Sequence, residues 1–292
     1  MQPTHPVSRR TFLGAAAAAL PLAMRQRAAG PPKPAAPLRD YSPGIELYTV
    51  RDELTKDLMG TVRAVAKLGY KIVEFYSPYY SWTPEMAKDM KKLLDDLGLK
   101  CYSTHNSAMA LGGSGIQKAI DLNQAIGSRY IVMASPPAGT NSIDGWKSVA
   151  NILNAGVDKL KPLGMSAGYH NHQIEWKAID GQRPMDVLAK NTVPEVVLQF
   201  DVGTCVEVGE DPIKWIEANP GRIRSMHCKD WSPANAYATL FGEGISPWAK
   251  IFDAAEKTGG VEYYLVEQEQ GPANEQLQRA EKCLANWKKL RG

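Results

Sequence analysis

The stretch GYHNHQIEW, residues 168–176, is the first of four similar runs from which the fold and the site of this chain can be predicted. The other three are VVLQFDVG at 196–203, RIRSMHCKD at 222–230 and YYLVEQE at 263–269. Each run contains the apolar, β-branched or aromatic residues of a buried strand, and each ends in imidazole or carboxylate side chains. Four strands that all end in such groups are hard to explain by packing alone. The pattern therefore favours a metal site at one edge of a parallel sheet.

The same alternation of apolar strands and amphipathic helices extends over most of the chain. We expect strands at residues 45–50, 71–75, 100–104, 130–134, 166–170, 196–201, 224–228 and 262–267. Helical patterns lie between or after them, at 61–68, 84–97, 116–126, 145–163, 185–190, 212–218, 248–258 and 274–290. Strands separated by helices predict a parallel sheet. Their nearly continuous apolar character predicts a sheet that is covered on both faces.

Two parallel architectures fit this order of elements, an open doubly wound sheet and a closed barrel. The open sheet would have a glycine-rich phosphate loop after its first strand. The first predicted strand instead runs into Tyr48-Thr49-Val50-Arg51-Asp52, which contains no glycine. Residues 44–292 also match the roughly 250 residues of a typical barrel. We therefore predict an α/β fold, a (β/α)₈ TIM barrel, over residues 44–292.

The pattern of the N-terminal residues is typical of an export signal and not of a folded domain. Ser8-Arg9-Arg10-Thr11-Phe12-Leu13 is a twin-arginine pattern, and an apolar stretch at 14–24 and small residues at 28–29 follow it. The apolar stretch is shorter than the roughly 20 residues that a membrane-spanning helix needs. We predict a twin-arginine signal peptide at residues 1–30, a Pro/Ala-rich linker at 31–43, and a periplasmic or otherwise exported protein without stable membrane insertion.

Charge and cysteine content exclude several classes of function. The formal net charge is +3, and removing the four arginines of the first 30 residues, which hold no acid, leaves −1. No basic surface for nucleic acid is therefore predicted. The cysteines are not in a Cys-x-x-Cys arrangement, which argues against a zinc knuckle or a thioredoxin-type site. We expect packing roles for Cys101, Cys205, Cys228 and Cys283.

Alternate side chains of a strand share a face, so four pairs are expected to point into the barrel. These are His170 with His172, Gln199 with Asp201, His227 with Lys229, and Glu267 with Glu269. Imidazole and carboxylate groups together suit one divalent ion, such as Mn²⁺, Zn²⁺, Co²⁺ or Mg²⁺. The ion would polarise a carbonyl or alkoxide while a flanking carboxylate or histidine moved a proton on the adjacent carbon. That is the chemistry of aldose–ketose isomerisation and of epimerisation through an enediolate.

Taken in order, these motifs resemble the xylose-isomerase-like barrel superfamily, also described as sugar phosphate isomerases/epimerases. IELYTVRDEL, VEFY and YHNHQIEW look like its first, second and fifth strands, and FDVG, MHCKD and VEQE like its sixth to eighth. Residues 241–245, FGEGI, resemble its loop before the seventh helix. The exported, twin-arginine-bearing branch is the most similar. The resemblance covers nearly all of 44–292 and implies a small carbohydrate substrate. Barrels of this kind often form homo-oligomers, although no stretch here marks an interface.

The resemblance also implies a set of metal ligands. Epimerases of this family bind their ion through Glu, Asp, His and Glu of strands five to eight, and the last three match Asp201, His227 and Glu267. The strand-five Glu is replaced here by a His-Asn-His run. We therefore expect Glu175, in the following loop, as the fourth ligand, with His170 or His172 as the alternative.

Further polar residues near strand ends are assigned to catalysis or to substrate binding. His170, His172, Lys229 and Glu267 are the predicted catalytic residues, with Lys229 stabilising a developing oxyanion. Tyr48, Arg51, Glu74, His105 and Glu269 are the predicted substrate contacts. For four of these residues, a purely structural role is the alternative. Glu74 would otherwise anchor a neighbouring strand, His105 would be a buried structural group, Lys229 would pair with Asp230 or Glu269, and Arg51 would pair with a surface acid.

The leading functional hypothesis is a divalent-metal-dependent isomerase or epimerase that acts on a free sugar or keto-sugar. Export argues against a phosphorylated substrate, because phosphosugars are mainly cytoplasmic. A lyase or hydrolase of 3-keto-glycosides that uses the same metal and base is the alternative. A non-catalytic sugar-binding barrel is the alternative of another class. Abasic-site nucleases share this fold, but they need a basic surface that composition does not provide.

Overall fold

The computed structural model describes residues 39–292. The predicted signal peptide and the first part of the predicted linker lie outside these residues and stay predictions. The end of the linker belongs to the fold, because Asp40 N donates to Glu262 O at 2.7 Å and Tyr102 OH donates to Asp40 Oδ2 at 2.8 Å. Within residues 39–292, no helix combines the length and the apolar character that crossing a membrane requires.

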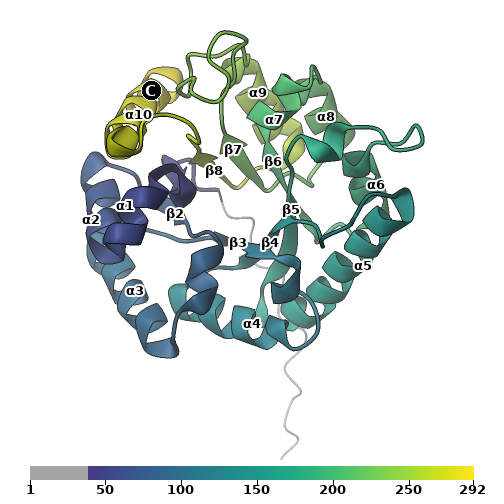
Figure 1. Ribbon diagram of the computed structural model, residues 1–292, viewed down its shortest axis with the longest axis horizontal. Helices are drawn as coiled ribbons and strands as arrows, with labels where there is room; N and C mark the ends of the chain where they lie inside the picture. The colour runs from purple at the N-terminus through teal and green to yellow at the C-terminus, as the bar shows by residue number, and fades with distance from the viewer. Residues whose placement is uncertain (1–38) are drawn as a thin grey trace, which may run out of the picture. The chain divides into compact units, whose positions relative to one another are not determined.

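The strands form one parallel sheet that curls into a barrel (Figure 1). They are β1 (Gly44–Glu46), β2 (Ile72–Glu74), β3 (Ser103–Ser107), β4 (Tyr130–Ser135), β5 (Ser166–His170), β6 (Val197–Asp201), β7 (Ser225–Cys228) and β8 (Tyr263–Val266). Their order is β2-β1-β8-β7-β6-β5-β4-β3. Parallel bridges from Ile72 to Lys100 and from Phe75 to Thr104 join β2 to the β3 segment. The predicted TIM barrel is confirmed.

Helices follow the strands and form an outer ring, as Figure 1 shows. They are α1 (Arg51–Lys56), α2 (Leu58–Leu68), α3 (Pro84–Leu97), α4 (Gly115–Ile126), α5 (Ile143–Leu160), α6 (Pro184–Asn191), α7 (Val202–Glu207), α8 (Pro212–Ala218), α9 (Trp248–Ala254) and α10 (Gln276–Arg291). Short 3₁₀ turns are η1 (Leu47–Val50), η2 (Ser77–Ser81), η3 (Ala108–Ala110), η4 (Lys161–Leu163), η5 (Ile174–Trp176) and η7 (Ala273–Glu275), and η6 (Ala255–Gly259) is a π-helical turn.

Local sequence explains where the helices begin and end. The Thr83 side chain accepts from Met86 N and caps α3, and Pro84 occupies the first turn, where a missing N–H costs nothing. Gly98 ends the same helix at φ +66°, a left-handed conformation that favours glycine. These signals account for the agreement between the predicted helix at 84–97 and α3.

The first strand differs from the prediction. A strand was expected over 45–50, but β1 ends at Glu46 and the chain turns into η1 and α1. The Glu46 carboxylate accepts from Tyr48 N at 3.3 Å, which replaces a ladder hydrogen bond with a local turn. Tyr48 and Arg51 therefore lie on the loop beyond the strand. Helix α7 was also not predicted, and it begins where Asp201 Oδ1 accepts from Thr204 N at 2.9 Å.

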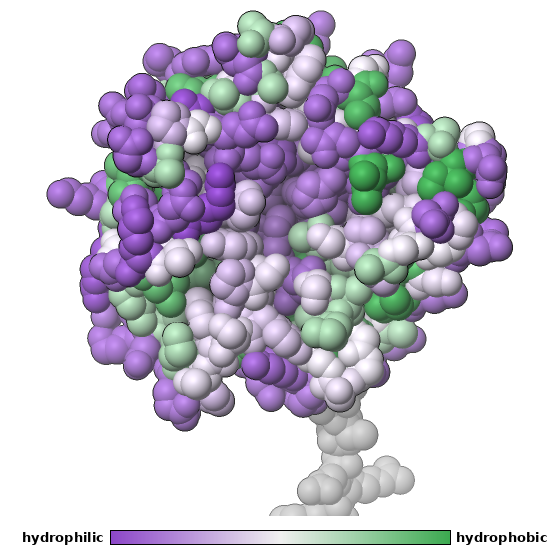
Figure 2. Space-filling view, viewed as in Figure 1, coloured by the Kyte–Doolittle hydropathy of each residue, from purple (hydrophilic) through white to green (hydrophobic). Residues whose placement is uncertain are grey.

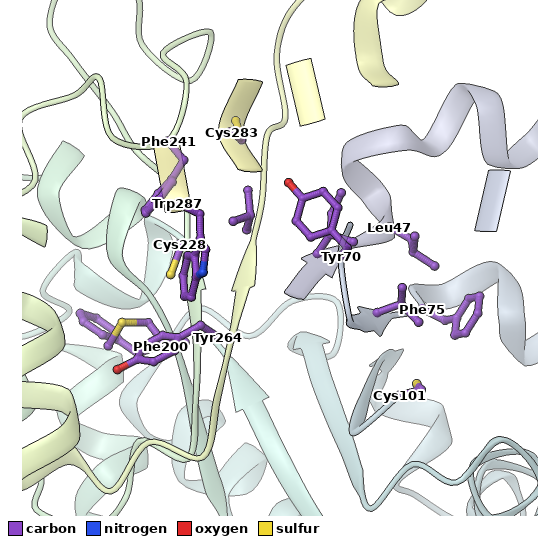
Figure 3. Packing of buried hydrophobic residues seen from close by; sticks show 14 of the residues in the cluster. Leu47, Tyr70, Phe75, Cys101, Phe200, Cys228, Phe241, Tyr264, Cys283 and Trp287 are labelled. Carbon is purple, nitrogen blue, oxygen red and sulfur yellow. The ribbon is translucent and has the colours of Figure 1, made fainter. Parts of the chain in front are cut away.

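The largest apolar core lies between the strands and the helices (Figure 3). Cys228 and Tyr264 of neighbouring strands pack there with Phe241 and Trp287, and all are fully or nearly fully buried. All four cysteines are buried free thiols, which agrees with the packing roles expected of them. A separate small cluster groups Ile72, Tyr130, Val132, Val197, Tyr263 and Leu265. Val197 and Leu265 precede Gln199 and Glu267 by two positions and so share their inward face.

Candidate metal centre and its surroundings

Parallel pairing brings the polar ends of β5 to β8 to one edge of the barrel. His170 of β5 is in register with Gln199 of β6, and Asp201 of β6 is in register with His227 of β7. Glu267 directly follows β8. Residues that lie far apart in the sequence therefore meet at the C-terminal face, where TIM barrels build their active sites. Figure 2 shows a hollow with hydrophilic residues at the centre of the ring of helices.

Four of these side chains form a compact group that we call the ligand group: His170, Asp201, His227 and Glu267. One ligand atom from each lies within 4.8 Å of the others, and all four residues are buried. His227 Nδ1 is 2.9 Å from Glu267 Oε2, and His170 Nε2 is 3.9 Å from Asp201 Oδ2. Two imidazoles and two carboxylates form a donor set that suits Zn²⁺, Mn²⁺ or Co²⁺.

Unpartnered atoms test whether this group fits a divalent ion. His170 Nδ1 and Asp201 Oδ2 are buried, and neither has a hydrogen bond of good geometry. Burial, reinforced by the positive charge of His227, holds the pKa of His170 well below its ordinary value. The His170 ring is therefore neutral and offers a lone pair, as metal binding requires. Leaving His170 Nδ1 buried without a partner is costly, and Asp201 Oδ2 has only the ammonium of Lys229 beside it, at 2.7 Å. The chemistry of these four donors therefore fits a divalent ion.

Lys229 enters the same space from the end of β7. Its Nζ lies 2.7 Å from Asp201 Oδ2, 2.8 Å from Glu269 Oε1 and 3.3 Å from Glu267 Oε2. Burial disfavours the charged form, but the three carboxylates outweigh it and raise the pKa of Lys229 well above its ordinary value. Lys229 is therefore a fixed cation beside the ligand group. Lys229 was predicted to form an ion pair with Asp230 or Glu269 if its role is structural. The structure contains the pair with Glu269.

A second polar layer supports the ligand group from β2, β3 and β6. Glu74 Oε2 lies 2.7 Å from His227 Nε2, and Gln199 Nε2 donates to Glu74 Oε1 at 2.9 Å. His105 Nε2 lies 2.6 Å from Gln199 Oε1. Glu74 has no exposed surface, and His105 is 7% exposed. Glu74 was predicted to contact substrate. In the structure its carboxylate is instead bound by other protein groups, of which His227 is the principal one.

Glu175 lies outside the ligand group. Its carboxylate accepts from Tyr169 OH at 2.5 Å and from His172 N at 2.7 Å, and it is fully buried. These bonds hold the turn after β5 and leave the carboxylate away from the four candidate ligands. The group of four donors thus contains His170, the stated alternative, and not Glu175, which was expected as the fourth ligand.

His172 is partly buried beside His170, with the two ring centroids 4.8 Å apart and the rings nearly perpendicular. Burial, followed by the positive charge of Lys229, lowers the pKa of His172 to about 4. Its ring is therefore neutral at neutral pH. The strand ends at His170, so His172 belongs to the turn that follows and not to the inward face of β5.

The predicted contacts of the first strand gather at the rim. The Arg51 guanidinium lies 4.5 Å from the Tyr48 ring centroid, and Arg51 Nη2 donates to Glu269 O at 3.0 Å. The Tyr48 ring meets Tyr76 edge to face, with centroids 5.3 Å apart, and Tyr48 is 38% exposed. Tyr48, Arg51 and Glu269 thus come together on the solvent side of Lys229. The predicted pairing of Arg51 with a surface acid is replaced by a bond to a backbone carbonyl.

The loop between β7 and α9 is anchored by Asp230. Asp230 Oδ2 accepts from Gly242 N at 3.0 Å, from Gly244 N at 3.1 Å and from Trp248 Nε1 at 2.7 Å. A Cβ at Gly244 would lie 2.0 Å from Asp230 Oδ1, so the close approach requires glycine. This contact explains the FGEGI motif. The loop also brings the Tyr237 ring centroid to 5.3 Å from Lys229 Nζ.

Sequence reasoning assigned no site role to several residues of the centre. Glu46, Gln199, Ser103 and Tyr237 all contact residues of the ligand group or its supports. Glu46 and Gln199 could have been singled out from the sequence, because each is a polar residue within an apolar strand. Tyr237 could not, because it lies in a long loop whose course depends on Asp230.

The chain is similar in sequence to known proteins. The model of the family described as "Xylose isomerase-like TIM barrel" matches residues 62–287. An inosose dehydratase of Lacticaseibacillus casei is 26% identical over 243 residues, which cover 70% of this chain and 80% of the relative. Inosose dehydratases recur among the other relatives, including one of Geobacillus thermodenitrificans at 29% identity.

Solved structures show the same architecture. A sugar phosphate isomerase/epimerase from Parabacteroides distasonis superposes with a TM-score of 0.71 at 26% identity, covering 84% of this chain and 93% of that one. The IolI protein, whose crystal structure contains a bound zinc atom, superposes with a TM-score of 0.64 at 15% identity, covering 84% of this chain and 97% of that one. At such low identity the second likeness concerns the fold alone.

Proposed function

Because the chain belongs to the xylose isomerase-like TIM barrel family, we propose that it is a divalent-metal-dependent enzyme of keto-sugars or keto-polyols. Its reaction begins with removal of a proton from the carbon next to the carbonyl. The observation that carries the proposal is the ligand group, in which four buried donors lie within 4.8 Å of one another at the catalytic end of the barrel. A binding barrel without catalysis has no need of such a buried, charged cluster, which is costly to assemble.

The residues that would hold the ion are His170, Asp201, His227 and Glu267. When bound, a divalent ion supplies Lewis acidity that polarises the carbonyl and makes the adjacent C–H more acidic. The zinc in the related IolI structure supports the assignment of a divalent ion. Zn²⁺, Mn²⁺ and Co²⁺ remain the candidate ions, since the donor set accommodates each of them.

Lys229 and Glu269 carry the proton chemistry in this proposal. Lys229 keeps its proton because three carboxylates surround it, so it stabilises the negative charge that develops on the substrate oxygen. Burial, followed by repulsion from Glu267 and opposed by Lys229, raises the pKa of Glu269. A raised pKa makes this carboxylate a stronger base. Glu269 also lies at the rim, where substrate enters, and neutral His172 is the second candidate base.

Two outcomes share this first step. In elimination, the C–H electrons form a carbon–carbon double bond and the β-hydroxyl departs as water, taking the proton from Glu269. In epimerisation, a proton returns to the same carbon from its other face. The sequence favoured isomerisation or epimerisation with a lyase as the alternative. The inosose dehydratase relatives support the elimination, and the match to the Lacticaseibacillus casei enzyme covers 80% of its length. We therefore propose a dehydratase-type lyase first and an epimerase second.

The test incubates the Mn²⁺-loaded protein with inosose and, separately, with a 3-keto-glucoside in D₂O. Nuclear magnetic resonance then follows the C–H signal next to the carbonyl, and chromatography identifies the product. We expect exchange of that proton, with an unsaturated product indicating elimination and a stereoisomer indicating epimerisation. Glu269→Gln should lower the exchange rate by at least about 100-fold, as expected for loss of a general base. The exposed Glu281→Gln is the matched control. No exchange with either substrate contradicts the proposal.

A further inference from the structure

Every acceptor position of Glu74 is turned toward the protein. Its Oε2 lies 2.7 Å from His227 Nε2 and 3.2 Å from His105 Nε2. Its Oε1 accepts from Gln199 Nε2 at 2.9 Å and from the Ser103 hydroxyl. The side chain is completely buried. Glu74 is thus held in one position from β3, β6 and β7, and it has no surface from which to contact a substrate.

The neighbouring carboxyl of Glu46 completes this environment. Burial, followed by repulsion from Glu74, raises the pKa of Glu46 well above its ordinary value. Burial alone would raise the pKa of Glu74, but His105 and His227 lower it to about 2. Glu74 is therefore a carboxylate, and its hydrogen-bond partners are His227, Gln199 and the Ser103 hydroxyl.

We propose that Glu74 is a positioning residue that determines which ring nitrogen of His227 faces the metal ion. The Nε2–H of His227 donates to Glu74 Oε2, and Nδ1 lies 2.9 Å from Glu267 Oε2, inside the ligand group. Loss of the Nδ1 proton on binding an ion would therefore leave Nδ1 as the ligating nitrogen, while Glu74 keeps the proton on Nε2. Carboxylates that hold the second nitrogen of a ligating histidine fix its tautomer and ring orientation. The inference rests on the proposed function, because it concerns His227 as a ligand.

A chain of bonds fixes the orientation of Glu74 itself. His105 Nε2 donates to Gln199 Oε1 at 2.6 Å, which points the Gln199 amide nitrogen at Glu74 Oε1. His105 therefore influences His227 through Gln199 and Glu74. This gives a role to a histidine that the sequence placed either in contact with substrate or in a structural position.

Divalent-ion affinity tests the proposal, with Glu74→Gln as the variant and the exposed Glu281→Gln as its matched control. A glutamine at 74 can present its amide to His227 in either orientation, whereas the carboxylate can only accept. Competition with a chromogenic chelator would measure the dissociation constant for Zn²⁺. We expect Glu74→Gln to bind Zn²⁺ about 10- to 100-fold more weakly. Glu281→Gln should stay close to wild type.

Histidine nitrogen resonances of the Zn²⁺-loaded protein give a second readout, which a purely structural role would not move. In wild type, His227 should show a protonated Nε2 and a metal-bound Nδ1, assigned from the spectrum of His227→Asn. Zinc on Nε2 of the wild type overturns the inference, and this holds even if Glu74→Gln does not fold. Unchanged affinity and tautomer in Glu74→Gln also overturn it. Weaker affinity with an unchanged tautomer does the same, because Glu74 would then act only through packing.

The outcome for the wild type separates this inference from the proposed function. If wild type binds no divalent ion, the metal-dependent function itself fails and the role of Glu74 fails with it. If wild type binds the ion and exchanges substrate protons, but Glu74→Gln matches it in affinity and tautomer, only the role of Glu74 fails.

Discussion

Lys229 Nζ lies 2.7 Å from Asp201 Oδ2, so a buried ammonium contacts one of the carboxylates that would bind the ion. The same nitrogen also contacts Glu267, a second candidate ligand. Without an ion, this ammonium compensates the negative charge of the ligand group. An ion held by the ligand group would take over this compensation and would leave the ammonium available to the substrate oxygen.

Replacing Lys229 by Met should therefore destabilise the metal-free protein more than the metal-loaded one. Removing one partner of a buried ion pair typically costs about 3 to 5 kcal/mol, because the remaining charge has no compensation. A divalent ion supplies that compensation, so loading with Zn²⁺ should recover much of the loss. Urea denaturation with and without Zn²⁺ measures both effects.

Lys257→Met is the matched control for this change, because Lys257 pairs with Asp253 at the exposed surface. Exposed ion pairs contribute about 1 kcal/mol or less. An equal loss of stability in both variants would contradict the role of Lys229.

His172 should make the metal-free protein less stable as the pH falls from 6.5 toward 4. Its pKa is about 4 in the folded protein, so between these values the unfolded chain binds a proton that the folded protein does not. The contribution of His172 to the free energy of unfolding is fully present above pH 6.5 and is lost as the pH falls to 4, a difference of about 3 kcal/mol. Urea denaturation of wild type and His172→Asn across this range isolates the contribution. Parallel stability curves for the two proteins would contradict it.

Gly203 allows α7 to approach the end of β7. A Cβ at this position would lie 2.8 Å from the Lys229 carbonyl oxygen, which is closer than real contacts permit. Gly203→Ala should cost about 1 to 3 kcal/mol by overpacking and should lower activity by displacing Lys229. Gly112→Ala is the control, because its nearest contact would be an ordinary 3.5 Å. Thermal denaturation and proton exchange measure the two effects, and wild-type values for Gly203→Ala would refute the account of this contact.

Asp230 should govern the order of the loop at residues 231–247. Asp230→Ala leaves the two glycine amides and the Trp248 indole without their acceptor, at a cost of about 1 to 3 kcal/mol for each buried donor that stays unpaired. We expect limited proteolysis to cut this loop faster in the variant, and mass spectrometry would locate the cut. Cleavage at the wild-type rate would show that other contacts hold the loop.

The barrel could be predicted from the sequence because its signals are local and repeated. The apolar strands and the capped helix at Pro84–Leu97 each carry their own start and stop residues. The histidine and carboxylates of β6 to β8 were found for the same reason, since each follows an apolar strand. The first strand was predicted too long, because the Glu46 carboxylate forms a turn that no apolar pattern reveals.

The fourth ligand could not be decided from the sequence. Glu175 and His170 are only five positions apart, and choosing between them depends on which one turns inward. In the structure, Tyr169 and the His172 amide capture Glu175. Glu74 posed the same difficulty, because its partners Ser103, Gln199 and His227 come from three other strands. Such long-range partners are visible only once the barrel has closed.

The metal content of the purified protein tests the central claim most directly, with Asp201→Asn as the variant and exposed Asp144→Asn as its matched control. Asparagine can still cap α7 but lacks the charge that binds the ion. We predict about one divalent ion per chain in wild type and in Asp144→Asn, and its loss in Asp201→Asn, by inductively coupled plasma mass spectrometry after reloading and dialysis. No bound ion in wild type, or equal content in all three proteins, would contradict the account.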